Sequence, residues 1–218
     1  MKITEKLIVS FLIITVVIGI YFFYTNKDFY AYLVQEDGFF ENLTSIFLFL
    51  SSFYLFYFFI SNIKLKSIWW KMGIIIMIIG LFFGAGEEIS WGQRIFHIES
   101  SKFFNENNSQ KETNLHNMIV DGVKLNKLIF SNLLSIIFSI YFLILPILWR
   151  KNNFIKKTIN QFGIPTANNY QVIIFMISSL IIILSISNER KWEIWEYTFA
   201  LTMFLIVLNP LNKKEIIE

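Results

Sequence analysis

The sequence predicts an all-α, polytopic membrane helix bundle with about six transmembrane helices and with both termini on the cytoplasmic side. Three observations lead to this fold class. Hydrophobic residues make up 55% of the chain and aromatic residues 18%, and the mean hydropathy of +0.55 lies above the usual range of soluble domains. Apolar runs close to the roughly 20 residues that cross a bilayer recur along the chain. The charges between these runs are segregated by sign.

Six apolar runs are the expected transmembrane helices of a single domain over residues 1–218. They lie at about 7–24, 43–60, 68–85, 128–149, 170–187 and 192–209. The first run is followed by a polar stretch rather than by a small-residue cleavage site, so we expect a retained helix. The sixth run carries Glu193 and Glu196 in its first turns. Cysteine is absent, so chemistry at any site must use oxygen and imidazole groups.

The charge distribution predicts the orientation. Lys and Arg accumulate in the short cytoplasmic loops of membrane proteins. With a cytoplasmic N-terminus, the inner segments hold 11 basic and 3 acidic residues, and the outer segments hold 8 basic and 13 acidic residues. We therefore expect an N-in, C-in protein. Abundant Ile, Asn, Lys and Phe are typical of AT-rich bacterial genomes, which favours a bacterial cytoplasmic membrane.

The small net charge of +3 lies in short clusters beside the apolar runs. These clusters suit the anionic headgroups of a lipid bilayer. They do not form the basic groove or stacking surface that a nucleic-acid partner requires. The sequence does not predict an oligomeric state.

A polar block at residues 86–127 follows the third run, and we expect it on the extracytoplasmic side. Glu87 and Glu88 end the run, and ionisable groups at a membrane helix end indicate a functional site. The two carboxylates lie about 100° apart on a helix, so at least one should point into the bundle. Arg94 follows closely and could hold a carboxylate or clamp an anionic substrate group.

The second half of the block contains a possible metal-ligand pair. Glu112 and His116 have the i, i+4 spacing that places two ligands on one face of a helix. A site rich in carboxylates suits Mg²⁺, Mn²⁺ or Ca²⁺ better than a His-dominated zinc site. The possible cofactor is therefore a divalent metal ion.

The other two outer segments also carry carboxylates. If the sixth helix extends back to Asn188, then Glu189, Glu193 and Glu196 share one helix face, where their repulsion must be neutralised by water, an arginine or a bound cation. The segment before the second run contributes Glu36, Asp37 and Glu41, although Glu41 also suits the positive end of a helix dipole.

These patterns give three sets of candidate residues. The catalytic candidates are Glu87, Glu88, Arg94 and His116. The substrate-binding candidates are Glu36, Asp37, Glu41, Trp91, Gln93, Asn114 and Asn117. The candidate metal ligands are Glu88, Glu112, His116 and Glu193.

The motifs GAGEEISWGQRIF, NxQxExNLHN and EDGxxENLT, which cover about residues 36–117, resemble a pattern shared by a group of bacterial multi-pass membrane proteins with no assigned activity. This resemblance implies a common membrane fold. The Glu pair also loosely resembles the first motif of the glutamate-dependent intramembrane proteases of the CAAX-processing type. In that motif an Arg follows three residues after the pair, whereas here Trp91 stands at that position.

Two functions are compatible with these features. In the first, the outer helix ends form an enzyme site, a metal-dependent hydrolase or transferase that acts on a lipid-linked or cell-envelope substrate, with one protonated and one ionised carboxyl group as acid and base. In the second, the same acids form the mouth of a transporter, channel or ligand-binding protein. A shared site requires Glu87 or Glu88 to lie within about 8 Å of Glu41 and of the Glu112/His116 pair.

Overall fold

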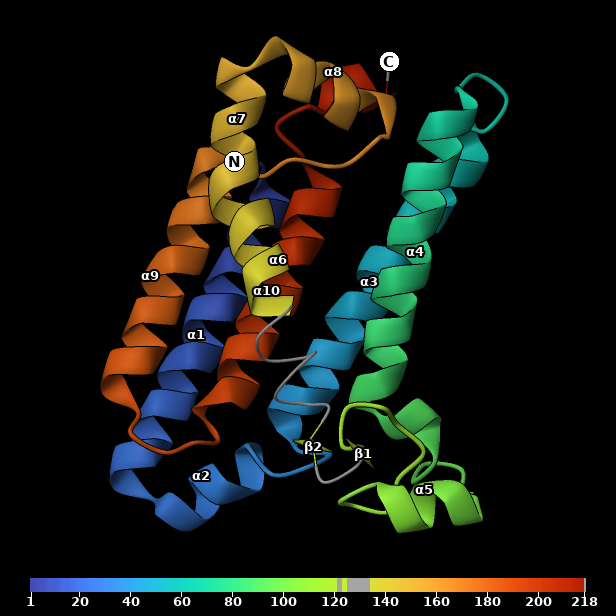
Figure 1. The fold of residues 1–218 in the computed structure, drawn as a ribbon. Helices are drawn as coiled ribbons and strands as arrows, with labels where there is room; N and C mark the ends of the chain where they lie inside the picture. Colours follow the sequence, from blue (N-terminus) through green and yellow to red (C-terminus); the bar gives the residue numbers. More distant parts are fainter. Residues whose placement is uncertain (121–122, 125–133, 218) are drawn as a thin grey trace.

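The computed structural model describes residues 1–120, 123–124 and 134–217, which form a bundle of long helices with shorter elements at both ends (Figure 1). The long helices are α1 (Ile3–Thr25), α3 (Phe39–Asn62), α4 (Ile68–Glu88), α9 (Asn169–Ser185) and α10 (Lys191–Leu208). The short helices are α2 (Lys27–Leu33), α5 (Lys102–Asn107), α6 (Leu134–Ser139), α7 (Leu145–Lys151), α8 (Asn153–Gln161) and α11 (Lys213–Ile217). Strands β1 (Ile119–Val120) and β2 (Val123–Lys124), of two residues each, pair antiparallel in a short hairpin, which is the only sheet in the described part.

The membrane assignment is supported by three of these helices. Within the described residues, α1, α3 and α4 are long and apolar enough to cross a bilayer. They correspond to the first three predicted runs. Their outward faces expose large apolar side chains, such as Ile76 and Ile79 on α4, at 65% and 62%. Such faces suit contact with lipid rather than water.

The last three predicted runs are helical where they are described. Residues 128–133 of the fourth run lie outside the described residues, and the remainder forms α6, a π-helical turn (Ile140–Ile144) and α7. Pro146 lies at the start of α7, directly after the π-helical turn. The fifth run is α9 and the sixth is α10.

Helix α10 is the central helix of the bundle. It packs against α1, α3 and α9, whereas α4 packs along α3. Along α10, Tyr197, Leu201 and Leu205 have no exposed surface. The polar Thr198 and Thr202 are equally buried, and each hydroxyl donates to the carbonyl four residues earlier in the same helix. Of the five long helices, the one with the least apolar sequence is thus covered by the others.

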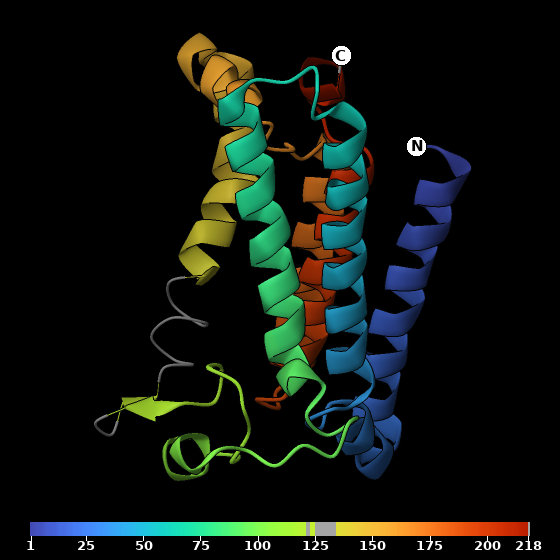
Figure 2. The same ribbon diagram turned by 90° about the vertical axis from the view of Figure 1, so that its right-hand side faces the viewer.

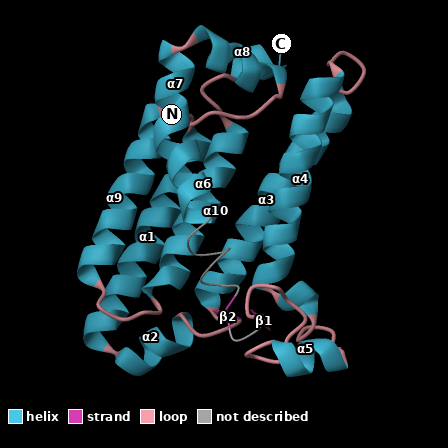
Figure 3. Cartoon of the chain, viewed as in Figure 1, coloured by secondary structure: helices cyan, strands magenta, loops and turns pink. Residues whose placement is uncertain are grey.

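The segments at the two ends of the bundle differ. One end carries α2, α5 and the β-hairpin, as the view turned by 90° also shows (Figure 2). The other end carries both termini, α8 and the connection from α3 to α4 (Figure 3). We call the first the polar end and define it as residues 26–38, 89–120 and 186–190 together with the helix ends that they join. The three acidic connections predicted from the sequence therefore lie together.

Candidate functional site

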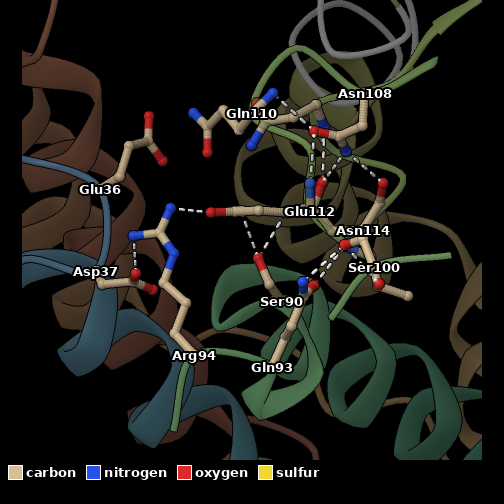
Figure 4. A network of polar contacts seen from close by, with 12 residues as sticks. Glu36, Asp37, Ser90, Gln93, Arg94, Ser100, Asn108, Gln110, Glu112 and Asn114 are labelled. Carbon is tan, nitrogen blue, oxygen red and sulfur yellow. Dashed lines mark hydrogen bonds and ion pairs between the residues drawn. The ribbon is translucent and has the colours of Figure 1, made fainter. Parts of the chain in front are cut away.

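Two arginines, which together make four ion pairs, join the three connecting segments at the polar end. The Arg190 guanidinium lies 2.7 Å from Glu36 and 3.5 Å from Glu193. The Arg94 guanidinium lies between Asp37 and Glu112 and pairs with both carboxylates (Figure 4). Arg94 therefore ties the turn before α3 to the loop that follows α5.

Glu112 is buried in this arrangement, and all of its contacts are internal. Besides Arg94, its carboxylate accepts hydrogen bonds from the Ser90 hydroxyl at 2.6 Å and the Asn114 amide at 3.1 Å. Asn114 also donates to Ser90 at 2.8 Å and accepts from the Asn108 amide at 2.8 Å. We call Ser90, Arg94, Asn108, Glu112 and Asn114 the polar network (Figure 4).

Gln93 fixes the same loop from the other side. Its amide donates to the Ser100 hydroxyl at 2.6 Å, and its carbonyl accepts the backbone N–H of Thr113 at 2.7 Å. The chain here is irregular, and Ser90, Trp91 and Lys111 adopt φ values of 46°, 55° and 61°. These side chains and backbone groups thus bond one another in place of regular secondary structure.

Both carboxylate oxygens of Glu87 also accept hydrogen bonds within the fold. Its carboxylate accepts the Trp91 indole N–H at 2.9 Å and the backbone N–H groups of Leu115 and His116 at 2.6 and 3.0 Å. Only 4% of Glu87 is exposed. The Trp91 ring packs beside Gly86, where an added Cβ would lie 2.8 Å from the indole. Glu87 therefore anchors the loop at residues 114–117 to the end of α4.

Glu88, the next residue, points into a pocket of about 460 Å³. This pocket lies between α4 on one side and α6 and α10 on the other, with Thr44 and Leu48 of α3 between them. Its described walls are mainly apolar and include Met77, Leu81, Phe138, Phe199 and Met203. Its polar lining comes mainly from Glu87, Glu88, His116 and Glu196.

Glu88 and Glu196 differ from the acids of the polar network because neither carboxylate has a hydrogen bond or ion pair within the described part of the chain. The charges of Glu36, Glu41, Glu193 and Glu196 all act on Glu88. Glu41 itself accepts the backbone N–H of Asp37. The predicted distance of about 8 Å from Glu87 or Glu88 to Glu41 and to the Glu112/His116 pair stays a prediction.

His116 reaches the pocket from the loop that Glu87 anchors. Burial lowers the pKa of His116, and the negative charges of Glu36 and Glu87 oppose that effect. The imidazole is therefore held toward its neutral form, in which one ring nitrogen can accept a proton and the other can donate one.

The structure does not form the predicted metal site. Among the described residues, no group of three or more His, Asp or Glu side chains is arranged to hold a metal ion. The i, i+4 argument assumed a helix, but residues 112–116 form turns, so Glu112 points to Arg94 while His116 points to the pocket. Glu193 pairs with Arg190. Glu189 precedes the first residue of α10, so the predicted three-acid helix face is wrong at that position.

Most of the remaining candidates have partners within the protein. Glu36, Asp37, Glu41, Trp91, Gln93 and Asn114 make the contacts described above, and the backbone of Asn117 bonds Asn114 and Ser109. Their predicted role in substrate binding stays a prediction. The candidate lists omitted Glu196 and the apolar walls. An acid in the first turns of an otherwise apolar helix was the signal for Glu196, but the walls come from four separate helices and leave no local pattern.

Comparison with known proteins identifies no relative: the chain matches no protein-family model, no curated protein and no solved structure.

Proposed function

We propose that this protein is a membrane-embedded enzyme that binds a lipid-like substrate in the pocket and uses Glu88 and Glu196 as its acid and base. The observation that supports the proposal is that the pocket has an apolar part and a carboxylate-lined part. Its walls inside the bundle are apolar, and at the polar end it is lined by two carboxylates that have no hydrogen bond or ion pair to any described residue. Ligand sites in proteins combine mostly apolar walls with a few polar groups in this way.

The chemistry follows from two carboxyl groups in one pocket. A protonated carboxyl group can give a proton to a leaving group, while an ionised neighbour takes one from a nucleophile. His116 adds a neutral imidazole that can pass a proton between them and the water outside. The reaction class is hydrolysis or group transfer at a polar bond next to an apolar chain.

The location follows from the charge pattern. The positive-inside bias of the sequence supports a location of the polar end on the extracytoplasmic side of a bacterial cytoplasmic membrane. A substrate there would be a lipid or a lipid-linked envelope precursor that reaches the site within the membrane. The resemblance of the GEEISWGQR and NxQxExNLHN motifs to those of bacterial multi-pass membrane proteins agrees with this location.

The experiment is turnover of envelope lipids by purified protein reconstituted in nanodiscs, followed by mass spectrometry. The wild type should convert at least one lipid species, and Glu88→Gln and Glu196→Gln should each slow this conversion by about a hundredfold or more. Glu99→Gln is the matched control because Glu99 is an exposed acid outside the pocket. Full activity in both pocket variants, or no conversion by the wild type, would overturn the proposal. Binding without turnover would favour the ligand-binding alternative.

A further inference from the structure

The shape of the pocket limits the substrate to one chain. The residues that α4 contributes include Met77, Gly80, Leu81, Gly84 and Glu88, which form one stripe of the helix. From Met77 to Glu88 this stripe runs about 16 Å along the axis. The volume of about 460 Å³ lies in the lower half of the usual range for small-molecule sites, about 300–1,000 Å³. A space of this length and volume suits a single extended hydrocarbon chain.

The charges at the polar end select the headgroup. Glu88 and Glu196 line the pocket, and no Lys or Arg is among its described lining residues. Arg94 and Arg190, two cations of the polar end, are already paired with carboxylates. A phosphate or carboxylate headgroup would therefore meet like charge with no cation among the described lining residues to offset it, whereas an ammonium group would meet two acceptors.

The absence of a side chain at Gly80 leaves space in the pocket for a hydrocarbon chain. A Cβ placed on Gly80 would meet no atom within 4 Å, so a larger side chain there enters the pocket without a clash. The other glycines of α4 differ. A Cβ on Gly73 would lie 2.0 Å from the Phe162 carbonyl oxygen, and a Cβ on Gly84 would touch Leu48 at 3.6 Å. Gly80 is therefore the position at which a substitution can shorten the pocket and leave its polar end unchanged.

We propose that the pocket takes a single-chain lipid amine, with the ammonium group held by the ionised member of the Glu88 and Glu196 pair, the reacting polar bond beside the protonated member, and the chain passing Gly80 toward Met77. This assignment rests on the proposed function for the choice of site. It adds the charge of the headgroup and the residue that sets the chain length.

The test is binding of single-chain probes to the reconstituted protein, measured by native mass spectrometry against empty nanodiscs. Dodecylamine should bind about tenfold or more tightly than dodecanoate or dodecanol. The Glu88→Gln and Glu196→Gln variants should each reduce this preference. Equal binding of the three probes to the wild type would overturn the headgroup assignment and leave the proposed enzyme intact.

Chain length is tested with Gly80→Leu. This variant should keep octylamine and lose most of its binding of hexadecylamine, because leucine fills the space beside Gly80. Ile79→Leu is the matched control, since Ile79 lies next to Gly80 and is exposed on the outer face of α4. Unchanged hexadecylamine binding in Gly80→Leu would overturn the assigned path of the chain. Absence of binding by every probe to the wild type would remove both this inference and the pocket on which the proposed function depends.

Discussion

Glu87 and Glu88 are adjacent in the sequence, yet their surroundings differ completely. Glu87 accepts three hydrogen bonds and holds a loop. Glu88 has no partner in the described structure and faces a pocket. The same contrast separates Glu112 of the polar network from Glu196 of α10. Buried acids that are satisfied add to stability, whereas acids left without partners cost stability and are kept at sites of function.

The test with the largest expected effect on stability compares Glu87→Ala with Glu88→Ala. Removal of the Glu87 carboxylate leaves the Trp91 indole and two backbone N–H groups without an acceptor, so we expect a loss of about 3 kcal/mol. Removal of Glu88 breaks no hydrogen bond to a described residue, and because an acid without a partner costs stability, we expect a neutral or slightly stabilising effect of at most about 0.5 kcal/mol. Thermal unfolding in detergent measures both. Equal losses would show that the two acids do not differ in this way.

The next test concerns Arg94. Arg94→Ala leaves the buried Glu112 charge without its cation, and we expect a loss of about 1–2 kcal/mol because the guanidinium side of the pair is 46% exposed and screened by water. Lys102→Ala is the control, since its ion pair with Glu106 lies on the surface. That control should lose less than about 0.5 kcal/mol. A loss no greater in Arg94→Ala than in the control would contradict the role of Arg94 in joining two loops.

A smaller effect on stability is expected from substitutions at two glycines of α4, Gly84 and Gly86, which make a matched pair. Gly86→Ala would place a methyl group 2.8 Å from the Trp91 ring, so the indole must move away from Glu87. We expect a loss of about 1 kcal/mol. Gly84→Ala makes only an ordinary contact with Leu48 and should be neutral or slightly stabilising, because alanine favours a helix. The reverse order of unfolding temperatures would contradict the described packing of Trp91.

The smallest expected effect is a pH dependence from His116. Its pKa in the folded protein is lowered, so the unfolded chain binds a proton first as the pH falls. The imidazole should therefore reduce stability as the pH drops through about 6.5, the ordinary pKa of histidine. His116→Gln removes this effect. Unfolding of both proteins should be measured between neutral and mildly acidic pH. A wild type that gains stability relative to His116→Gln in this range would contradict the assigned environment.

Much of the fold follows from the sequence because long apolar runs fix where helices lie. The first three runs became α1, α3 and α4, and helix connectivity alone brought the three acidic connections to one end. The site was harder to predict because residues 89–118 are not helical over most of their length. Spacing rules apply to regular backbone, so the Glu112 and His116 argument failed where the chain turns. The roles of Glu87 and Glu88 depend on which backbone N–H groups contact each carboxylate. No local sequence pattern predicts those contacts.

The central position of α10 has a consequence for how the protein is made. Lys191, Glu193 and Glu196 make this helix a poor candidate to enter a bilayer alone. The helices that cover most of α10 are synthesised before it. They therefore provide a protein surface against which α10 can pack instead of lipid. Assembly should therefore finish with α10, which brings Glu196 and one wall of the pocket. The pocket would therefore form only when the bundle closes.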